Sequence, residues 1–546
     1  MLTRTKAHRL LVGLISLALW SSSAFVADPR GGFAKRWDSN QRLSVECGVS
    51  ASDLVTNTSP PSDQVRAAET TSRDSSPSAE TATLCIIGGG VSGLVAAITA
   101  AKNVEGDDKI VLLEASDRVG GRVQSDRTQD GFLLDRGFAV FIEEYPMAKK
   151  LLDYDKLKLK RFLPGALVKI RDNKGKGKLV KVSDPLRRPR DLFSALVSPV
   201  GSIKDKTKLV PLIVNVRRKS ISALFEEPET TTAEALQERW GFSSKMMDRF
   251  FRPFFEGIFL TPLEQQSSRM FSFVFKMLSE GSATLPENGM GAVAQQLEEN
   301  ALSLGLSIRT NNAVTKLSHN ESGGFVMETA QSTVEAENVI VATDVGIAQR
   351  LLSQLEGFEF LSEEATPVTQ RSVGCLYYAF EGEAPVSDPL LILNGEGQDR
   401  DSYASPINNV CFPSVVSADY APEGFGLCSV AILKGAMDAY QGKEEELDIA
   451  VRSQLADWFP DYSKDIGEKW ELKRIYYIPN AQPLQLGTAS PATVNGGRDS
   501  STILGRELPS GLFLCGDYMA TASLNGALES GVNAGMAAAA TKIVTR

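Results

Sequence analysis

Histidine is almost absent from this chain of 546 residues, which contains only His8 and His319. A Ser/His/Asp triad needs a histidine base, and catalytic zinc sites rely largely on histidine ligands. His8 lies in the N-terminal segment, and His319 falls in the polar stretch Ser318 to Gly324, where we expect a turn. The sequence therefore excludes hydrolysis by such a triad or by a metal, and we expect no metal site.

Cysteine is scarce as well, and its spacing is irregular. Disulfide-rich secreted domains and structural zinc sites show regular cysteine spacings. The six cysteines of this chain form no CxxC pair: they are Cys47, Cys85, Cys375, Cys411, Cys428 and Cys515. This pattern indicates reduced thiols, and we expect Cys515 to be a buried strand residue and not a nucleophile.

The sequence also lacks long apolar runs, internal repeats and a positive net charge. No segment reaches the roughly 20 consecutive apolar residues of a membrane-spanning helix. The net charge is -9, which argues against nucleic acid as a partner. A hydrophobic content of 42% nevertheless supports substantial cores, so we expect the chain from Thr81 onward to be globular.

The N-terminal segment has the features of a targeting sequence. Basic residues precede an apolar run from Leu10 to Trp20, and Ser22 and Ala24 supply the small residues that signal peptidase requires. The run is too short to cross a bilayer as a helix. We therefore expect residues 1–24 to be a cleaved signal peptide.

Residues 25–80 combine a basic, hydroxyl-rich beginning with a Ser-, Thr- and Pro-rich spacer that we expect to be disordered. Phe25 directly follows the predicted cleavage site. A signal peptide joined to such a transit-like segment resembles the bipartite presequence of proteins that enter plastids with additional bounding membranes. The resemblance implies a plastid (chloroplast) location, and the alternative is a secreted or endomembrane protein.

A nucleotide-binding pattern begins after the spacer. Thr83 to Ile87 is an apolar run, residues 88–93 read GGGVSG, and Leu94 to Ala101 continues as an Ala-rich helix. A GxGxxG turn between strand and helix lets a pyrophosphate approach the backbone and bind at the helix N-terminus. A second apolar run, Lys109 to Leu113, ends in Glu114, at the spacing where a carboxylate accepts the hydroxyls of an adenosine ribose. The combination predicts a dinucleotide site and disfavours NADP.

The loop after the second predicted strand indicates which dinucleotide binds. Residues 115–122 read ASDRVGGR. This RxGGR cluster resembles the second fingerprint of the flavin-containing amine oxidase superfamily, which includes plant-type phytoene desaturases and protoporphyrinogen oxidases. The resemblance implies that FAD is the cofactor, that the glycine pair lets the backbone touch it, and that the arginines meet its phosphates or flank the flavin. Residues 131–138, GFLLDRGF, match the next strand and turn of that superfamily.

Two further blocks extend the resemblance in the same order along the chain. Residues 289–314 resemble the segment whose valine, here Val314, holds the adenine through its backbone. Near the C-terminus, the resemblance implies that Asp517 binds the ribitol and that a helix from about Gly526 points its N-terminus at the flavin. The residues expected at the cofactor are Gly88, Gly90, Ser92, Gly93, Glu114, Ala115, Arg118, Gly120, Gly121, Arg122, Val314, Gly516, Asp517, Asn525, Gly526 and Ala527.

The fold class implied by these blocks is α/β, a Rossmann-like (GR2-type) FAD-binding domain with an inserted α+β substrate domain. We expect the FAD-binding domain to be assembled from residues 81–150, 286–350 and 501–546. Residues 151–285 are expected to form a helical substrate or membrane-facing part, and residues 351–500 a substrate domain with an antiparallel sheet.

The inserted parts carry the expectations about the substrate. The Phe-rich run from Phe242 to Phe275 has helical spacing, which predicts either a helix core or an aromatic tunnel for a long apolar substrate. The stretch from Lys149 to Lys219 is strongly basic in an otherwise acidic chain. It predicts either solvated helix faces or peripheral contact with an anionic membrane.

The reaction expected from the resemblance is oxidation of a small apolar substrate, isoprenoid, carotenoid-like or tetrapyrrole-like, with O2 or a quinone as the electron acceptor. Flavin chemistry requires no histidine, and no catalytic residue is assigned. Amine oxidases of this superfamily place a tyrosine over the flavin where this chain has Ser523, which argues against amine oxidation. The alternatives are flavin-dependent isomerisation or hydration of a polyene, amine oxidation, and a non-catalytic scaffold similar to the Rab GDP-dissociation inhibitors.

Overall fold

The computed structural model describes residues 80–104, 108–138, 140–171, 175, 177–183, 187, 198–364, 370–396, 405–484 and 499–545. The predicted signal peptide and transit-like segment therefore lie outside the described residues, apart from Glu80. Among the described helices, none combines the length and apolarity that a membrane span requires. The limits of the predicted domains stay predictions.

The first sheet contains five parallel strands. In spatial order they are β10 (Ser307–Arg309), β2 (Ile110–Leu113), β1 (Glu80–Ile87), β13 (Thr333–Val341) and β21 (Leu512–Leu514). Their apolar residues are almost continuously buried in β1, β2 and β21, as expected of strands covered on both faces. Parallel strands align their carboxyl ends, so the loops that follow these strands meet at one edge of the sheet.

The same sheet carries an antiparallel hairpin, formed by β11 (Val314–His319) and β12 (Phe325–Thr329), on the first half of β13. The sequence predicted a turn from Ser318, but Ser318 and His319 still belong to strand β11. His319 is the last residue of β11, because it pairs with Phe325 across the hairpin and its ring lies 4.9 Å from the Phe325 ring.

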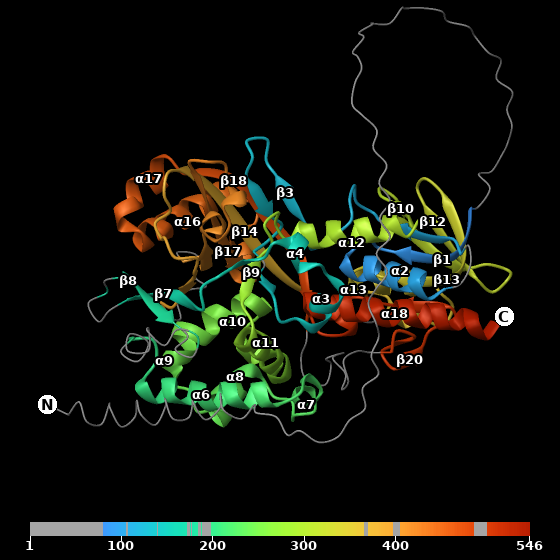
Figure 1. The fold of residues 1–546 in the computed structure, drawn as a ribbon, viewed down its shortest axis with the longest axis horizontal. Helices are drawn as coiled ribbons and strands as arrows, with labels where there is room; N and C mark the ends of the chain where they lie inside the picture. The colour runs from blue at the N-terminus through green and yellow to red at the C-terminus, as the bar shows by residue number, and fades with distance from the viewer. Residues whose placement is uncertain are drawn as a thin grey trace, which may run out of the picture. The chain divides into compact units, whose positions relative to one another are not determined.

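Two helices lie against this sheet with their backbones in close contact. They are α2 (Val91–Asn103), which follows β1, and α18 (Leu524–Thr545), which ends the chain (Figure 1). A Cβ added at Gly531 of α18 would lie 2.5 Å from the Ser92 carbonyl oxygen of α2. The two helices therefore approach each other at positions where only glycine fits.

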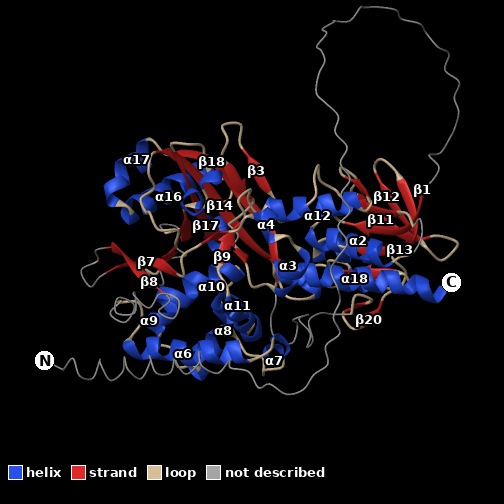
Figure 2. Ribbon diagram, in the orientation of Figure 1, coloured by secondary structure: helices blue, strands red, loops and turns tan. Residues whose placement is uncertain are grey.

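The second sheet has the spatial order β18 (Glu471–Pro483), β14 (Gln370–Glu381), β17 (Phe425–Leu433), β16 (Ile407–Cys411), β15 (Leu391–Asn394), β7 (Gly165–Arg171) and β8 (Gly177–Ser183). Its neighbours are antiparallel except for β15 and β7, so the predicted antiparallel strands are confirmed. One face packs on α16 (Glu444–Trp458) and α17 (Ser463–Glu468) (Figure 2). Together the two sheets confirm the α/β class with an inserted α+β part.

A helical layer contains the Phe-rich run, in α9 (Ser244–Met246), α10 (Arg252–Phe259) and α11 (Ser268–Glu280). The run is not one regular helix, because Met247–Phe251 forms a π-helical segment that shifts the register of the following residues. Phe251, Phe255 and Phe271 are fully buried, and the Phe255 and Phe271 ring centroids lie 4.8 Å apart. These rings form helix core, as one of the two predictions had it.

The remaining α-helices and strands are short, apart from α6 and α12. They are α3 (Pro146–Leu151), α4 (Tyr154–Leu157), α6 (Ile203–Arg218), α7 (Ile221–Phe225), α8 (Thr232–Glu234), α12 (Gly291–Ser303), α13 (Val345–Leu352), α14 (Pro413–Val416), α15 (Lys434–Ala439), β3 (Ser125–Arg127), β4 (Leu133–Asp135), β5 (Phe141–Ile142), β6 (Lys160–Arg161), β9 (Ala283–Leu285), β19 (Thr502–Ile503) and β20 (Arg506–Glu507).

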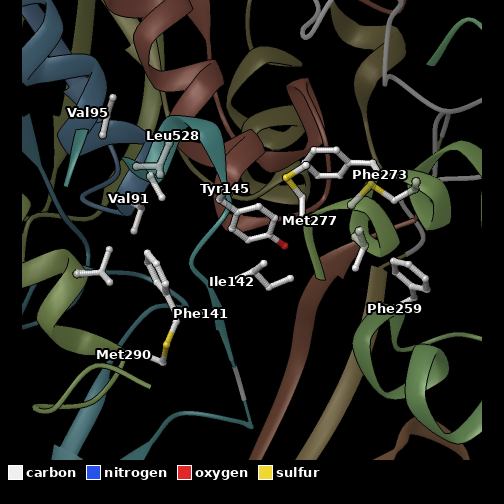
Figure 3. Close-up of a cluster of buried hydrophobic side chains, with 14 of the residues drawn as sticks. Val91, Val95, Phe141, Ile142, Tyr145, Phe259, Phe273, Met277, Met290 and Leu528 are labelled. Carbon is white, nitrogen blue, oxygen red and sulfur yellow. The ribbon is translucent and has the colours of Figure 1, made fainter. Parts of the chain in front are cut away.

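One apolar core connects the first sheet's helices with the helical layer. Val91 of α2, Leu528 of α18 and Phe273 of α11 belong to the same buried cluster. Figure 3 shows Tyr145 between the side chains from α2 and α18 and those from α11. Its ring stacks on Phe273 at a centroid distance of 6.1 Å. Because they share this core, the two parts depend on each other for burial.

The glycine contact between α2 and α18 yields a stability prediction. We expect Gly531→Ala to lower the free energy of unfolding by about 1–3 kcal/mol, because the new Cβ must displace the α2 backbone. Gly435→Ala in α15 is the matched control, since a Cβ there meets nothing within 4 Å, and we expect it to be neutral or slightly stabilising. Urea unfolding followed by circular dichroism measures both, and equal effects would contradict this account of the packing.

Candidate active site

The turn after β1 has the geometry expected of a GxGxxG motif. The Gly88 amide donates to the Leu113 carbonyl, at 2.8 Å, which ties the end of β1 to the end of β2. A Cβ at Gly93 would lie 2.0 Å from the Gly88 carbonyl oxygen, so no larger residue fits where α2 leaves the strand. Ser92, also predicted at the site, lies in the first turn of α2 and is buried.

The two predicted glycine loops lie side by side. The Gly120 amide donates to the Gly89 carbonyl at 2.8 Å, and Gly90 and Gly120 form a parallel bridge. No side chain caps the N-terminus of α2, and a Cβ at Gly90 would meet nothing within 4 Å. Gly121 comes directly after Gly120, and a Cβ added at Gly121 would lie 3.4 Å from the Gly90 Cα. The open backbone at an uncapped helix N-terminus is an arrangement that suits a phosphate.

Glu114 connects these loops from the end of β2. Its Oε2 accepts a hydrogen bond from the Gly89 amide at 2.6 Å, and its Oε1 accepts from the Ser116 amide at 2.8 Å and hydroxyl at 2.6 Å. Ala115 lies between them and is exposed. The buried carboxylate therefore fixes both loops, and its contact with a ribose stays a prediction.

The predicted adenine segment lies beside the same loop. The Glu114 amide donates to the Arg309 carbonyl, and the Asn312 amide donates to the Glu114 carbonyl, both at 2.8 Å. Val314, two residues further, is buried at the start of β11. The strand order thus places Val314 near Glu114, although about two hundred residues separate them in sequence.

Both predicted arginines form ion pairs with carboxylates. The Arg122 guanidinium makes two hydrogen bonds of 2.8 Å to Asp517 and a third, of 3.0 Å, to the Ala481 carbonyl. Asp517 itself is buried. This pair joins the glycine loop, the C-terminal segment and β18, three stretches that are far apart in the chain. Arg118 pairs with Asp126, while its buried Nε has no partner.

The start of α18 completes the site. The Gly516 amide donates to the Ser530 hydroxyl at 3.0 Å, and the Ser523 hydroxyl caps the helix by accepting from the Gly526 amide at 3.1 Å. Ala527 belongs to the first turn, and its amide donates to the Ser523 carbonyl at 3.0 Å. Asn525 uses its side-chain carbonyl to accept from the Met147 amide at 2.9 Å, so it anchors α3.

Several contacts at this edge had no signal in the sequence. Tyr145 hydrogen-bonds Ser523, and burial raises the pKa of the tyrosine. The Gln124 carboxamide donates to the Val119 carbonyl at 3.1 Å, while its buried oxygen has no partner. Gln370 of β14 donates to Asp344 at 3.3 Å, which ties the second sheet to the first. Such pairs join residues that no local pattern connects.

Cys515, at the end of β21, is fully buried, and burial raises the pKa of its thiol to about 12. A thiol with this pKa is neutral and a poor nucleophile at physiological pH. The predicted burial is confirmed, whereas Cys515 is the residue directly after β21 and not part of the strand. Within the described parts of the chain, the other cysteines are also buried and free.

The geometry agrees with comparisons with known proteins. Residues 91–539 match the family of flavin-containing amine oxidoreductases. The fold is similar to that of an Exiguobacterium sp. 255-15 protein provisionally named a protoporphyrinogen oxidase, with 19% identity and a TM-score of 0.60 over 86% of this chain and 99% of that one. A comparison with curated protein sequences gives no match.

Two amine oxidases show the same fold. A putrescine oxidase is 17% identical, with a TM-score of 0.57 over 85% of this chain and 99% of that one. Cyclohexylamine oxidase from Brevibacterium oxydans IH-35A is 15% identical, with a TM-score of 0.54 over 85% and 100%. At these identities the likeness shows the fold, whereas the family match covers most of the chain. The chain therefore belongs to the flavin-containing amine oxidoreductase family and is a flavin-dependent oxidoreductase.

Proposed function

We propose that the protein binds FAD along the carboxyl edge of its parallel sheet and oxidises a small apolar substrate. The observation that carries the proposal is the convergence of two glycine loops, Glu114 and the Arg122–Asp517 pair at one edge. The residues present fit the dinucleotide. Gly90 faces open space, α2 lacks a side-chain cap, and the buried Nε of Arg118 has no protein partner.

Each group at this edge has a role in the proposed complex. Glu114 accepts the ribose hydroxyls, the amides at the start of α2 bind the diphosphate, and Asp517 accepts the ribitol hydroxyls. The N-terminus of α18 stabilises negative charge on the ring system. When bound, FAD supplies a hydride acceptor for an activated C–H bond. The chain's own residues orient the substrate and exclude water.

The Phe-rich helices α10 and α11, here called the aromatic layer, favour an apolar substrate. Phe259 at the end of α10 packs on Phe255, with centroids 5.8 Å apart, and α10 lies against the second sheet at β15 and β16. We propose an isoprenoid, carotenoid-like or tetrapyrrole-like molecule as the substrate and O2 or a quinone as the electron acceptor. The alternatives are isomerisation or hydration of a polyene, amine oxidation, and a non-catalytic binding scaffold.

The proposal includes the protein's cellular location and its contact with a membrane. A plastid is proposed from the N-terminal segment alone, with a secreted or endomembrane protein as the alternative. Peripheral membrane contact is proposed from α6, where Ile203 is 64% exposed beside the exposed Lys204, and Arg217 and Arg218 are exposed at the other end of the helix. Basic residues next to an exposed apolar side chain suit the surface of an anionic bilayer.

The role of Glu114 is testable through cofactor affinity. We expect Glu114→Gln to weaken FAD binding by about 10- to 100-fold, the range for losing hydrogen bonds to a buried charged group. Glu328→Gln on the exposed face of β12 is the control, and we expect it to bind FAD normally. Quenching of FAD fluorescence on titration with apoprotein measures both affinities. Unchanged FAD affinity in Glu114→Gln would refute the placement of the ribose.

The reaction class is tested by spectroscopy of the chain without its predicted targeting segment. We expect flavin absorption bands that bleach on anaerobic titration with a carotenoid or with protoporphyrinogen, and not with putrescine or another amine. Bleaching by an amine alone would make amine oxidation the function. A protein that stays colourless after refolding with FAD would leave only the scaffold.

A further inference from the structure

A buried arginine in the second sheet has no counter-ion among the residues that the structure describes. Arg371 is the second residue of β14 and is 4% exposed. Its Nη1 donates to the Phe259 carbonyl at 2.6 Å, and its Nε and Nη2 have no hydrogen-bond partner in the described parts of the chain. Burial lowers the pKa of the guanidinium to about 10, and no carboxylate among the described residues raises it again. Arg371 is still cationic at neutral pH, and an uncompensated buried charge is costly.

The two nitrogens without a partner form one edge of the guanidinium. The Nε–H and one Nη2–H bond point in the same direction, and this fork matches the two oxygens of a carboxylate. The third nitrogen is the one that holds the end of α10 through Phe259. Arg371 is therefore fixed by one side of its guanidinium, and its bidentate side is buried without a partner among the described residues.

Other polar atoms beneath α10 lack partners as well. Gln482, which lies opposite Arg371 on β18, donates to the Ile258 carbonyl at 2.9 Å, and its Oε1 has no partner. Asn408 of β16 donates to the Pro253 carbonyl at 3.2 Å, while its Oδ1 and the Nδ2 of Asn409 are left without partners. Three strands thus present incompletely bonded polar groups to one helix. Buried polar groups normally find partners, so this set is suited to a polar ligand.

This polar set begins next to the proposed cofactor site. Gln370 bonds Asp344, and Arg371 is the next residue; Ala481 bonds Arg122, and Gln482 is the next residue. Neighbouring residues of a strand are about 3.3 Å apart along its axis. The other side of the set is apolar, because Phe259 belongs to the aromatic layer with Phe273 and Met277 (Figure 3).

We propose that Arg371 binds a carboxylate of the substrate, which makes the substrate class an apolar molecule that bears an acidic group. The inference rests on the proposed function, because it takes the contact region of α10 and the second sheet, next to the cofactor edge, as the substrate's place. The aromatic layer would receive the apolar body, and the unpartnered Oε1 of Gln482 would accept from a hydroxyl or N–H group of the substrate and not contact the carboxylate. A neutral hydrocarbon would leave the charge of Arg371 uncompensated.

Binding of cis-parinaric acid, a fluorescent polyene fatty acid, tests this inference against its methyl ester, which has the same chain and no charge. We expect the wild-type chain to bind the acid at least tenfold more tightly than the ester. Arg371→Gln should bind both within about twofold of each other, with unchanged flavin content. Arg371→Lys keeps the charge without the fork and should retain a partial preference. Arg350→Gln, at an exposed position on α13, is the control and should behave as wild type.

Thermal unfolding separates binding from a structural role. Because the free protein gains stability when an uncompensated buried charge is removed, we expect the Tm of Arg371→Gln to equal or exceed that of wild type. A lower Tm with equal losses of acid and ester binding would mean that Arg371 only holds α10, and it would overturn the inference. A wild type without preference for the acid, or loss of flavin in Arg371→Gln, would overturn it too.

The failure of the inference and that of the proposed function are distinguishable. A colourless chain that still prefers parinaric acid through Arg371 would refute the flavin reaction and keep the carboxylate site. A flavin-containing chain that binds acid and ester equally would keep the reaction and refute the site.

Discussion

The parallel pairing of β1, β2, β10, β13 and β21 is the constraint on which the rest of this structure depends. Between two parallel strands the chain must return to the opposite end of the sheet. In this protein the returning segments include the inserted substrate-domain parts. The alignment brings Gly88, Glu114 and Gly516 to one edge from positions spread over more than four hundred residues. The proposed FAD site consists of residues that meet at this edge.

Two kinds of close packing hold the edge in place. Glycines let α18 touch α2 backbone to backbone, while the Arg122–Ala481 and Gln370–Asp344 hydrogen bonds join the second sheet to the first. The helical layer shares its apolar core with α2 and α18. In contrast, the polar groups between α10 and the second sheet are incompletely bonded, which costs stability. Proteins commonly accept such a cost where a ligand supplies the missing partners.

Much of the frame was predictable because its signals are local. The glycine spacing of residues 88–93 and the apolar runs of β14 and β17 each depend on a few neighbouring positions. The burial of Cys515 follows from the same kind of pattern. The predictions about His319 and the Phe-rich helix were wrong in detail, since the hairpin ladder extends two residues into the predicted turn and a π-helical segment interrupts the helix.

The sequence by itself determined the fold class, the nucleotide-binding motifs and the antiparallel strands, because backbone conformation and burial depend on residues close together in the chain. Only the tertiary structure decided that Asn525 anchors α3, that Arg122 pairs with Asp517, and that Arg371 is buried with no counter-ion among the described residues. The physical reason is that a side chain's partners are set by which distant segments pack together. The sequence around a charged strand residue looks the same whether or not a distant segment of the fold places a counter-ion beside it.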